Sequence, residues 1–182
     1  MSLERSLKEI GKALNRLSAR GVIRGYALIG GLAVSTWGLP RGTKAIDLLV
    51  SLEAIKNLKA FQKALEKEGF SPKLYRGGPS DPVPFLLKVV HEGVPVDMLI
   101  TTKKWEDEAV ENSVGMDFHG VKIPVIPVEY LVVMKLKAGG PRDILDVEEL
   151  LQIGDINPQL LEGLSKRLRV DKRLERIRRK KG

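Results

Sequence analysis

Two aspartates stand alone inside apolar segments of the sequence. Asp47 lies within IDLLV and Asp97 lies within VDML. A carboxylate among buried residues is costly unless it is paired or binds a metal ion. Carboxylate oxygens are the ligands that Mg²⁺ prefers, so two such strands side by side could hold a divalent cation. The structural alternative for Asp97 is a partly exposed edge position.

A glycine pair precedes the first acid. Residues 26–29 are apolar, Gly30 and Gly31 follow, and residues 32–37 contain neither charge nor proline. This order predicts a strand, a tight turn and the start of a helix. Glycines accept positive φ and let a ligand phosphate approach backbone N–H groups at a helix N-terminus. A glycine pair alone is weak support, but Arg41-Gly42-Thr43-Lys44 comes just before the acidic strand.

These residues carry a resemblance. The first segment resembles the opening motif of the polymerase-β-type nucleotidyltransferase superfamily, most closely its AbiEii-like toxin or MNT-like branch, at Gly30, Gly31, Gly38, Arg41, Thr43 and Asp47. Residues 127–151 resemble a later block of the superfamily, in which a lysine-bearing helix is followed by a break and by Arg-x-x-Asp. The third acid of the superfamily corresponds to Asp97. Together these parts cover residues 22–153.

The resemblance implies a fold and an activity. The fold would be an α/β nucleotidyltransferase fold, a mixed sheet flanked by helices with a helical C-terminal part. The activity would be transfer of a nucleotide from a nucleoside triphosphate (NTP) to a hydroxyl on RNA, such as a tRNA 3′ end, or on protein. Two Mg²⁺ or Mn²⁺ ions would be bound by the acids. The toxin branch implies a neutralising antitoxin protein as a partner.

The resemblance also implies site residues. The catalytic metal ligands would be Asp47 and Asp97, and the nucleotide would be bound by Gly30, Gly31, Arg41, Thr43, Lys44, Lys135 and Asp146. In this set Asp146 could orient Lys135 or another base. Spacing alone allows plainer roles, because Arg142 and Asp146 could form a surface ion pair and Lys135 could extend from an apolar helix to solvent.

Position 45 departs from the motif. The superfamily has its first acid there, whereas this chain has Ala45, whose methyl group cannot bind a cation. Asp47 and Asp97 would hold at most one ion, weakly, so the chain as written should be catalytically impaired. Two explanations remain, an engineered replacement in an active enzyme or a natural pseudoenzyme. Because the other motif residues are retained, the first is favoured.

The positive charge of the chain lies at its C-terminus. The formal net charge is +8, and the segment Lys166–Gly182 alone contains ten Lys or Arg and two acids. Such a segment is typical of an electrostatic arm for nucleic acid, but a solvated, fraying helix explains it equally well. The predicted nucleic-acid-binding residues are Lys172, Arg173, Arg176, Arg178, Arg179, Lys180 and Lys181.

Hydrophobic spacing predicts the elements that carry these residues. Helices are expected over 3–20, 53–68, 105–112, 127–137, 142–153 and 160–168, with hairpins through 92–93 and 119–120 and a loop over 71–84. We expect a core over residues 1–126 with its N-terminal helix, a helical part over 127–168 packed on the core, and a basic tail over 169–182.

Composition limits the functional classes. The absence of cysteine excludes disulfides and thiolate metal sites. No apolar run is long enough for a membrane span, and the N-terminus lacks the features of a signal peptide, so we expect a cytoplasmic protein without a membrane partner. Two alternative functions remain: a non-catalytic nucleotide- or RNA-binding pseudoenzyme, and a small-molecule nucleotidyltransferase of the aminoglycoside type.

Overall fold

The computed structural model describes residues 2–153, 155–180 and 182. The chain divides into two compact units. The first comprises residues up to Leu32 and residues 42–126, and the second comprises residues 33–41 and 127 onward. Each unit is therefore described by itself.

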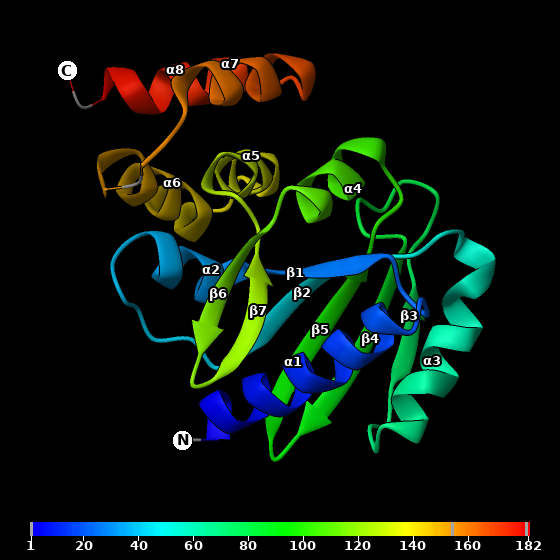
Figure 1. The fold of residues 1–182 in the computed structure, drawn as a ribbon. Coiled ribbons are helices and arrows are strands. Elements are labelled where there is room, and N and C mark those ends of the chain that lie inside the picture. The colour runs from blue at the N-terminus through cyan, green and yellow to red at the C-terminus, as the bar shows by residue number, and fades with distance from the viewer. Residues whose placement is uncertain (1, 154, 181) are drawn as a thin grey trace. The chain divides into compact units, whose positions relative to one another are not determined.

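The first unit is built on a seven-stranded sheet (Figure 1). The order across the sheet is β3 (Lys73–Arg76), β4 (Phe85–His91), β5 (Val94–Ile100), β2 (Ile46–Ser51), β1 (Gly25–Ile29), β7 (Val121–Val125) and β6 (Val114–Phe118). Strands β2 and β5 are parallel, as are β1 and β7, and the other neighbours are antiparallel. The sheet is thus mixed, as the sequence predicted.

Side-chain alternation gives the sheet two different faces. In β2 the buried Ile46, Leu48 and Val50 point to one face, and in β5 the buried Val96 and Met98 do the same. Helix α1 (Ser2–Ala19) runs along this face and contacts β1, β5 and β7 (Figure 1). The opposite face carries Asp47 and Asp97, and we call it the acidic face.

Two further helices complete the first unit. The predicted helix over 53–68 is interrupted: a 3₁₀ turn, η1 (Ile55–Asn57), precedes α3 (Leu58–Lys67), which buries Phe61 and Leu65. Helix α4 (Lys104–Glu111) contacts β1 and β2. Its Asp107 accepts hydrogen bonds from the hydroxyls of Ser51 (2.7 Å) and Thr101 (2.6 Å), which joins the ends of β2 and β5.

Both predicted hairpins are confirmed. Strands β4 and β5 are joined through Glu92 and Gly93, and β6 and β7 are joined through His119 and Gly120. All four turn residues have positive φ, which the two glycines adopt without strain.

The segment 71–84, predicted as a loop, contains strand β3, so that prediction is wrong over residues 73–76. This strand pairs antiparallel with β4, with Lys73 opposite Lys88 and Tyr75 opposite Leu86. The strand is short, lies at the sheet edge and buries little, so it leaves no alternating apolar pattern in the sequence. The flanking prolines and glycines concealed it.

The second unit is helical (Figure 1). It contains α5 (Val128–Ala138), α6 (Pro141–Ile153), α7 (Pro158–Arg167) and α8 (Asp171–Arg179), together with the end of α2 (Gly30–Trp37). Helix α5 contacts α6 and α7, and α7 contacts α8. Gly139 ends α5 in the left-handed conformation, at φ 68°. In α8, Leu174 and Ile177 are buried, so the basic segment folds as an amphipathic helix.

No helix within the described ranges combines the length and apolar character needed to cross a bilayer.

Candidate active site

The two predicted metal ligands are neighbours across the sheet. In the parallel pairing of β2 with β5, Asp47 lies opposite Asp97, and both side chains are half-buried on the acidic face. Adjacent strands are about 4.8 Å apart, so one cation could contact both carboxylates. Residues that are fifty positions apart in the chain are thus brought together by strand register.

Position 45 supplies no third ligand. Ala45 lies directly before β2, and its carbonyl oxygen accepts a hydrogen bond from the Thr43 hydroxyl at 3.3 Å. Among the residues that the structure describes, no group of three or more His, Asp or Glu side chains is arranged to hold a metal ion. The donor set fits one Mg²⁺ completed by phosphate oxygens and water, and it does not fit a two-ion site.

Gly30 places a helix start beside Asp47. Strand β1 ends at Ile29 and α2 begins at Gly30, which has φ 65°. A Cβ atom at this position would lie 2.3 Å from Asp47 Oδ2 and 2.9 Å from Asp47 Cβ, so only glycine fits both the conformation and the space. The N–H groups at a helix N-terminus favour anions, and here they begin next to the acid pair.

A lysine also lies on the acidic face, next to Asp97. Lys88 of β4 lies opposite Asp97 in the antiparallel pairing, and its Nζ is 4.0 Å from Asp97 Oδ1. Sequence reasoning missed Lys88, because its place beside the acid follows from the β4–β5 register. The predicted Lys44 is exposed, and Thr43 is half-buried.

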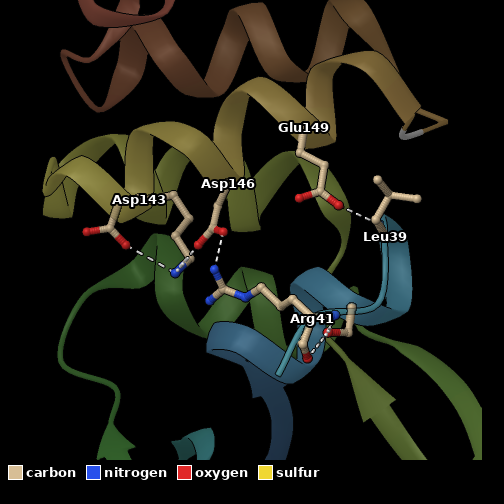
Figure 2. A network of polar contacts seen from close by, with 7 residues as sticks. Leu39, Arg41, Asp143, Asp146 and Glu149 are labelled. Atoms are coloured by element: carbon tan, nitrogen blue, oxygen red, sulfur yellow. Dashed lines mark hydrogen bonds and ion pairs between the residues drawn. The ribbon is translucent and has the colours of Figure 1, made fainter. Parts of the chain in front are cut away.

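The remaining predicted nucleotide-binding residues form a network inside the second unit (Figure 2). Asp146 of α6 is buried; its Oδ1 accepts from the guanidinium of Arg41, and its Oδ2 lies 2.9 Å from Lys135 Nζ. Lys135 of α5 is also 3.1 Å from Asp143 Oδ1. The expected pairing of Asp146 with Lys135 is therefore present, and it includes Arg41.

Backbone contacts fix the segment that carries Arg41. The N–H of Leu39 donates to Glu149 Oε1 at 2.6 Å, and the N–H of Arg41 donates to Ser35 Oγ at 3.2 Å (Figure 2). Glu149 was not predicted as part of this network. A carboxylate that accepts from a backbone N–H 110 positions earlier leaves no sequence signal.

The predicted nucleic-acid-binding residues lie on α8 and just after it, and they divide into two groups. Arg173 donates to the carbonyl of Leu136 at 2.7 Å, Arg178 pairs with Glu162, and Arg179 lies 3.4 Å from Glu175. The second group consists of Lys172, Arg176 and Lys180, and the side chains of both groups are exposed. Lys181 lies outside the described residues.

The basic side chains of α8 also border a cavity. It has a volume of about 380 Å³, and its basic lining residues are Lys137, Arg173, Arg176 and Lys180. Oxyanions would meet four positive side chains there, two of them arginines that can bind phosphate in bidentate fashion. The exposed bases of α8 are thus suited to contact a polyanion.

Comparison of the sequence with family models and with curated proteins gives no match. Solved structures do match. A nucleotidyltransferase-like antigenic protein from Paracoccidioides brasiliensis has a TM-score of 0.58 and 16% identity, over 96% of this chain and 89% of that one. A provisionally named nucleotidyltransferase from Thermotoga maritima has a TM-score of 0.57 and 16% identity, over 81% and 91%. ANT(2'')-Ia in complex with adenylyl-2''-tobramycin has a TM-score of 0.56 and 15% identity, over 91% and 97%. The chain therefore has a nucleotidyltransferase fold.

Proposed function

We propose that this protein transfers a nucleotide from an NTP to an acceptor hydroxyl, with a divalent cation bound between Asp47 and Asp97. The observation that carries the proposal is the register of β2 and β5, which pairs these two acids beside the glycine-led start of α2. The acceptor oxygen forms a bond to the α-phosphorus while the bond to pyrophosphate breaks, and the acceptor proton leaves to solvent. Asp47 and Asp97 would hold this cation, Mg²⁺ or Mn²⁺, which would supply charge neutralisation for the phosphate oxygens.

The residues of the chain take separate roles in this proposal. Asp47 and Asp97 bind the cation, and the N–H groups that follow Gly30 and Gly31 bind phosphate oxygens. Thr43 and Lys44 lie four and three residues before Asp47, respectively, and are suited to the same phosphates. Arg41 and Lys135 are proposed as further nucleotide-binding residues, and within the second unit Asp146 pairs with both of them while Asp143 pairs with Lys135.

Ala45 makes the protein a weak catalyst in this proposal. A two-ion site needs a carboxylate that bridges the ions, and the described residues supply only the acid pair. The same observation supports a second candidate, a pseudoenzyme that binds an NTP or RNA without chemistry. The difference between the two is whether slow transfer remains.

The acceptor in this proposal is a hydroxyl on RNA, including tRNA, or on protein. If the protein acts as a toxin, its partner is an antitoxin protein that neutralises it. The exposed bases Lys172, Arg176 and Lys180 support an RNA acceptor, because phosphate contacts provide most of non-specific affinity. An aminoglycoside acceptor is the alternative suggested by the adenylyl-tobramycin bound in ANT(2'')-Ia.

The test is transfer of label from α-labelled NTPs to total tRNA, to cell protein and to tobramycin in the presence of Mg²⁺. The unaltered chain is compared with Ala45→Asp, Asp47→Asn and Ala45→Asp/Asp47→Asn. A matched control is Asp155→Asn, which removes an exposed carboxylate of the second unit. We expect Ala45→Asp to raise the rate by at least tenfold, and Asp47→Asn to abolish transfer in both backgrounds.

Transfer that is insensitive to Asp47→Asn would overturn the assignment of the acid pair. If every variant is silent but NTP still binds and Asp47→Asn weakens that binding, the pseudoenzyme reading holds instead.

A further inference from the structure

The strand register extends the acid pair into a longer row of charged residues. Across the acidic face, Lys73 of β3 lies opposite Lys88 of β4, Lys88 lies opposite Asp97, and Asp97 lies opposite Asp47. The row therefore consists of two lysines on β3 and β4 followed by two aspartates on β5 and β2. All four side chains are on the same face, because directly opposed residues in a sheet share a face.

An exposed aromatic ring lies next to the lysines. Tyr75 is 43% exposed, and its ring centroid is 5.4 Å from Lys73 Nζ and 5.5 Å from Lys88 Nζ. Beyond it in the neighbouring row are the half-buried Leu86 and Leu99. We call Lys73, Tyr75 and Lys88 the lysine–tyrosine patch. Lys88 places one end of the patch beside Asp97, and the strand that carries Lys73 and Tyr75 is two strand spacings, about 10 Å, from β5.

The chemistry of the patch fits one class of molecule. Proteins that bind single-stranded nucleic acid combine positive charge along the backbone with aromatic side chains on which bases stack. The patch offers a ring with an apolar surface beside it and two ammonium groups. A base that stacks on Tyr75 would displace the ammonium groups from the ring, and they would then pair with the flanking phosphates.

The charge of the patch also argues against another acceptor class. An aminoglycoside is a polycation, and the two lysines would repel it on the approach to Asp97. The exposed bases of α8 have the same sign as the patch. Positive charge in both units therefore favours a polyanionic acceptor.

We propose that the lysine–tyrosine patch is the acceptor subsite of this protein and that it binds the end of a single-stranded RNA, with a base on Tyr75 and phosphates on Lys73 and Lys88. This inference rests on the proposed nucleotidyl transfer and names its substrate class. The bound strand lies along the acidic face, so its terminal hydroxyl is directed toward the acid pair.

Binding is measured without NTP, by fluorescence anisotropy of a labelled oligoadenylate titrated with the full chain at several salt concentrations. We expect Tyr75→Ala to weaken binding by about 5- to 150-fold, the range found when one base–aromatic stack is removed. Tyr75→Phe, which keeps the ring, should bind like the unaltered chain. The salt dependence separates the lysines, because Lys73→Glu should lower the slope of log Kd against log salt by about 0.7 for one lost phosphate contact.

Matched controls identify the patch as the site. Lys59→Glu makes the same charge change at an exposed position on α3. Because Lys59 is outside the patch, the slope of log Kd against log salt should equal that of the unaltered chain within error. Arg176→Ala tests α8 separately. If Tyr75→Ala and Lys73→Glu bind as Lys59→Glu does while Arg176→Ala loses affinity, RNA binds at α8 and the inference is wrong.

The outcomes also separate this inference from the proposed activity. If Ala45→Asp transfers label to RNA but Tyr75→Ala in that background leaves KM for the oligonucleotide unchanged, the activity stands and the subsite is wrong. If no variant transfers label but Tyr75→Ala still weakens oligonucleotide binding and Tyr75→Phe restores it, the subsite stands without the activity. Tight binding of tobramycin that Lys73→Glu leaves unchanged, with no oligonucleotide binding, would overturn the RNA class.

Discussion

Replacing Gly30 by alanine should destabilise the protein more than the same replacement at a glycine that has positive φ but open space around its Cβ position. Two terms add at this position. A non-glycine residue in the left-handed region costs about 1–2 kcal/mol. The added methyl group would also lie 2.3 Å from Asp47 Oδ2, and overpacking of this kind typically costs about 1–3 kcal/mol. We therefore expect the free energy of unfolding to fall by about 2–5 kcal/mol.

The chain contains a control that isolates the steric term. Gly21 has φ 73°, and a Cβ atom there would meet nothing within 4 Å, so Gly21→Ala carries the conformational term alone. Urea unfolding of both variants, followed by circular dichroism, gives the two free energies. The difference between them measures the contact with Asp47.

A double-mutant cycle tests the partner of that contact. Asp47→Ala removes the carboxylate but keeps Cβ, so Gly30→Ala should cost about 1 kcal/mol less in that background. The reasoning is refuted if Gly30→Ala costs no more than Gly21→Ala, or if Asp47→Ala leaves its cost unchanged. Either result would mean that α2 does not begin against the Asp47 side chain.

Three further predictions concern other parts of the fold. Burial raises the pKa of Glu106, so its folded-state pKa lies above the unfolded value; stability falls as the carboxyl ionises. Urea unfolding gives the free energies of unfolding of the unaltered chain and of Glu106→Gln. The unaltered chain should be less stable relative to the variant at about pH 8 than at about pH 4. An equal difference at both pH values would contradict this. Asp146→Ala leaves Arg41 and Lys135 without their shared partner and should cost about 3 kcal/mol in the same assay, whereas Asp146→Asn should cost less. Gly163→Ala, exposed inside α7 with open space at Cβ, should raise the free energy of unfolding by about 0.5–1 kcal/mol, and a loss would contradict the helix.

Local pattern predicted most of the elements. The helix over 3–20 was recognisable because Leu7, Ile10, Leu14 and Leu17 repeat at helical spacing, and the structure buries all four. Both hairpins were recognisable from their glycine turns. The edge strand β3 was not, because a four-residue strand that buries little has no periodicity to detect.

Some residues of the candidate site could be predicted from the sequence, and others could not. The motif pointed to Asp47 and Asp97 because isolated acids in apolar strands are conspicuous. Lys88 and Tyr75 escaped notice, because a lysine or tyrosine in an exposed strand is ordinary until register places it beside an acid. Register between distant strands depends on the whole sheet, and a single sequence does not contain it in readable form.

The place of β3 at the edge of the sheet affects how copies of this protein meet one another at high concentration. An edge strand presents backbone N–H and C=O groups that can pair with another chain, and charged residues on it prevent such pairing. Lys73 and Arg76 give β3 two positive charges within four residues, so two copies that approach edge to edge repel each other. A polyanion bound to Lys73 would cancel part of that repulsion. Self-association of the protein should therefore increase when nucleic acid is present, and an apolar residue at position 73 should have the same effect without it.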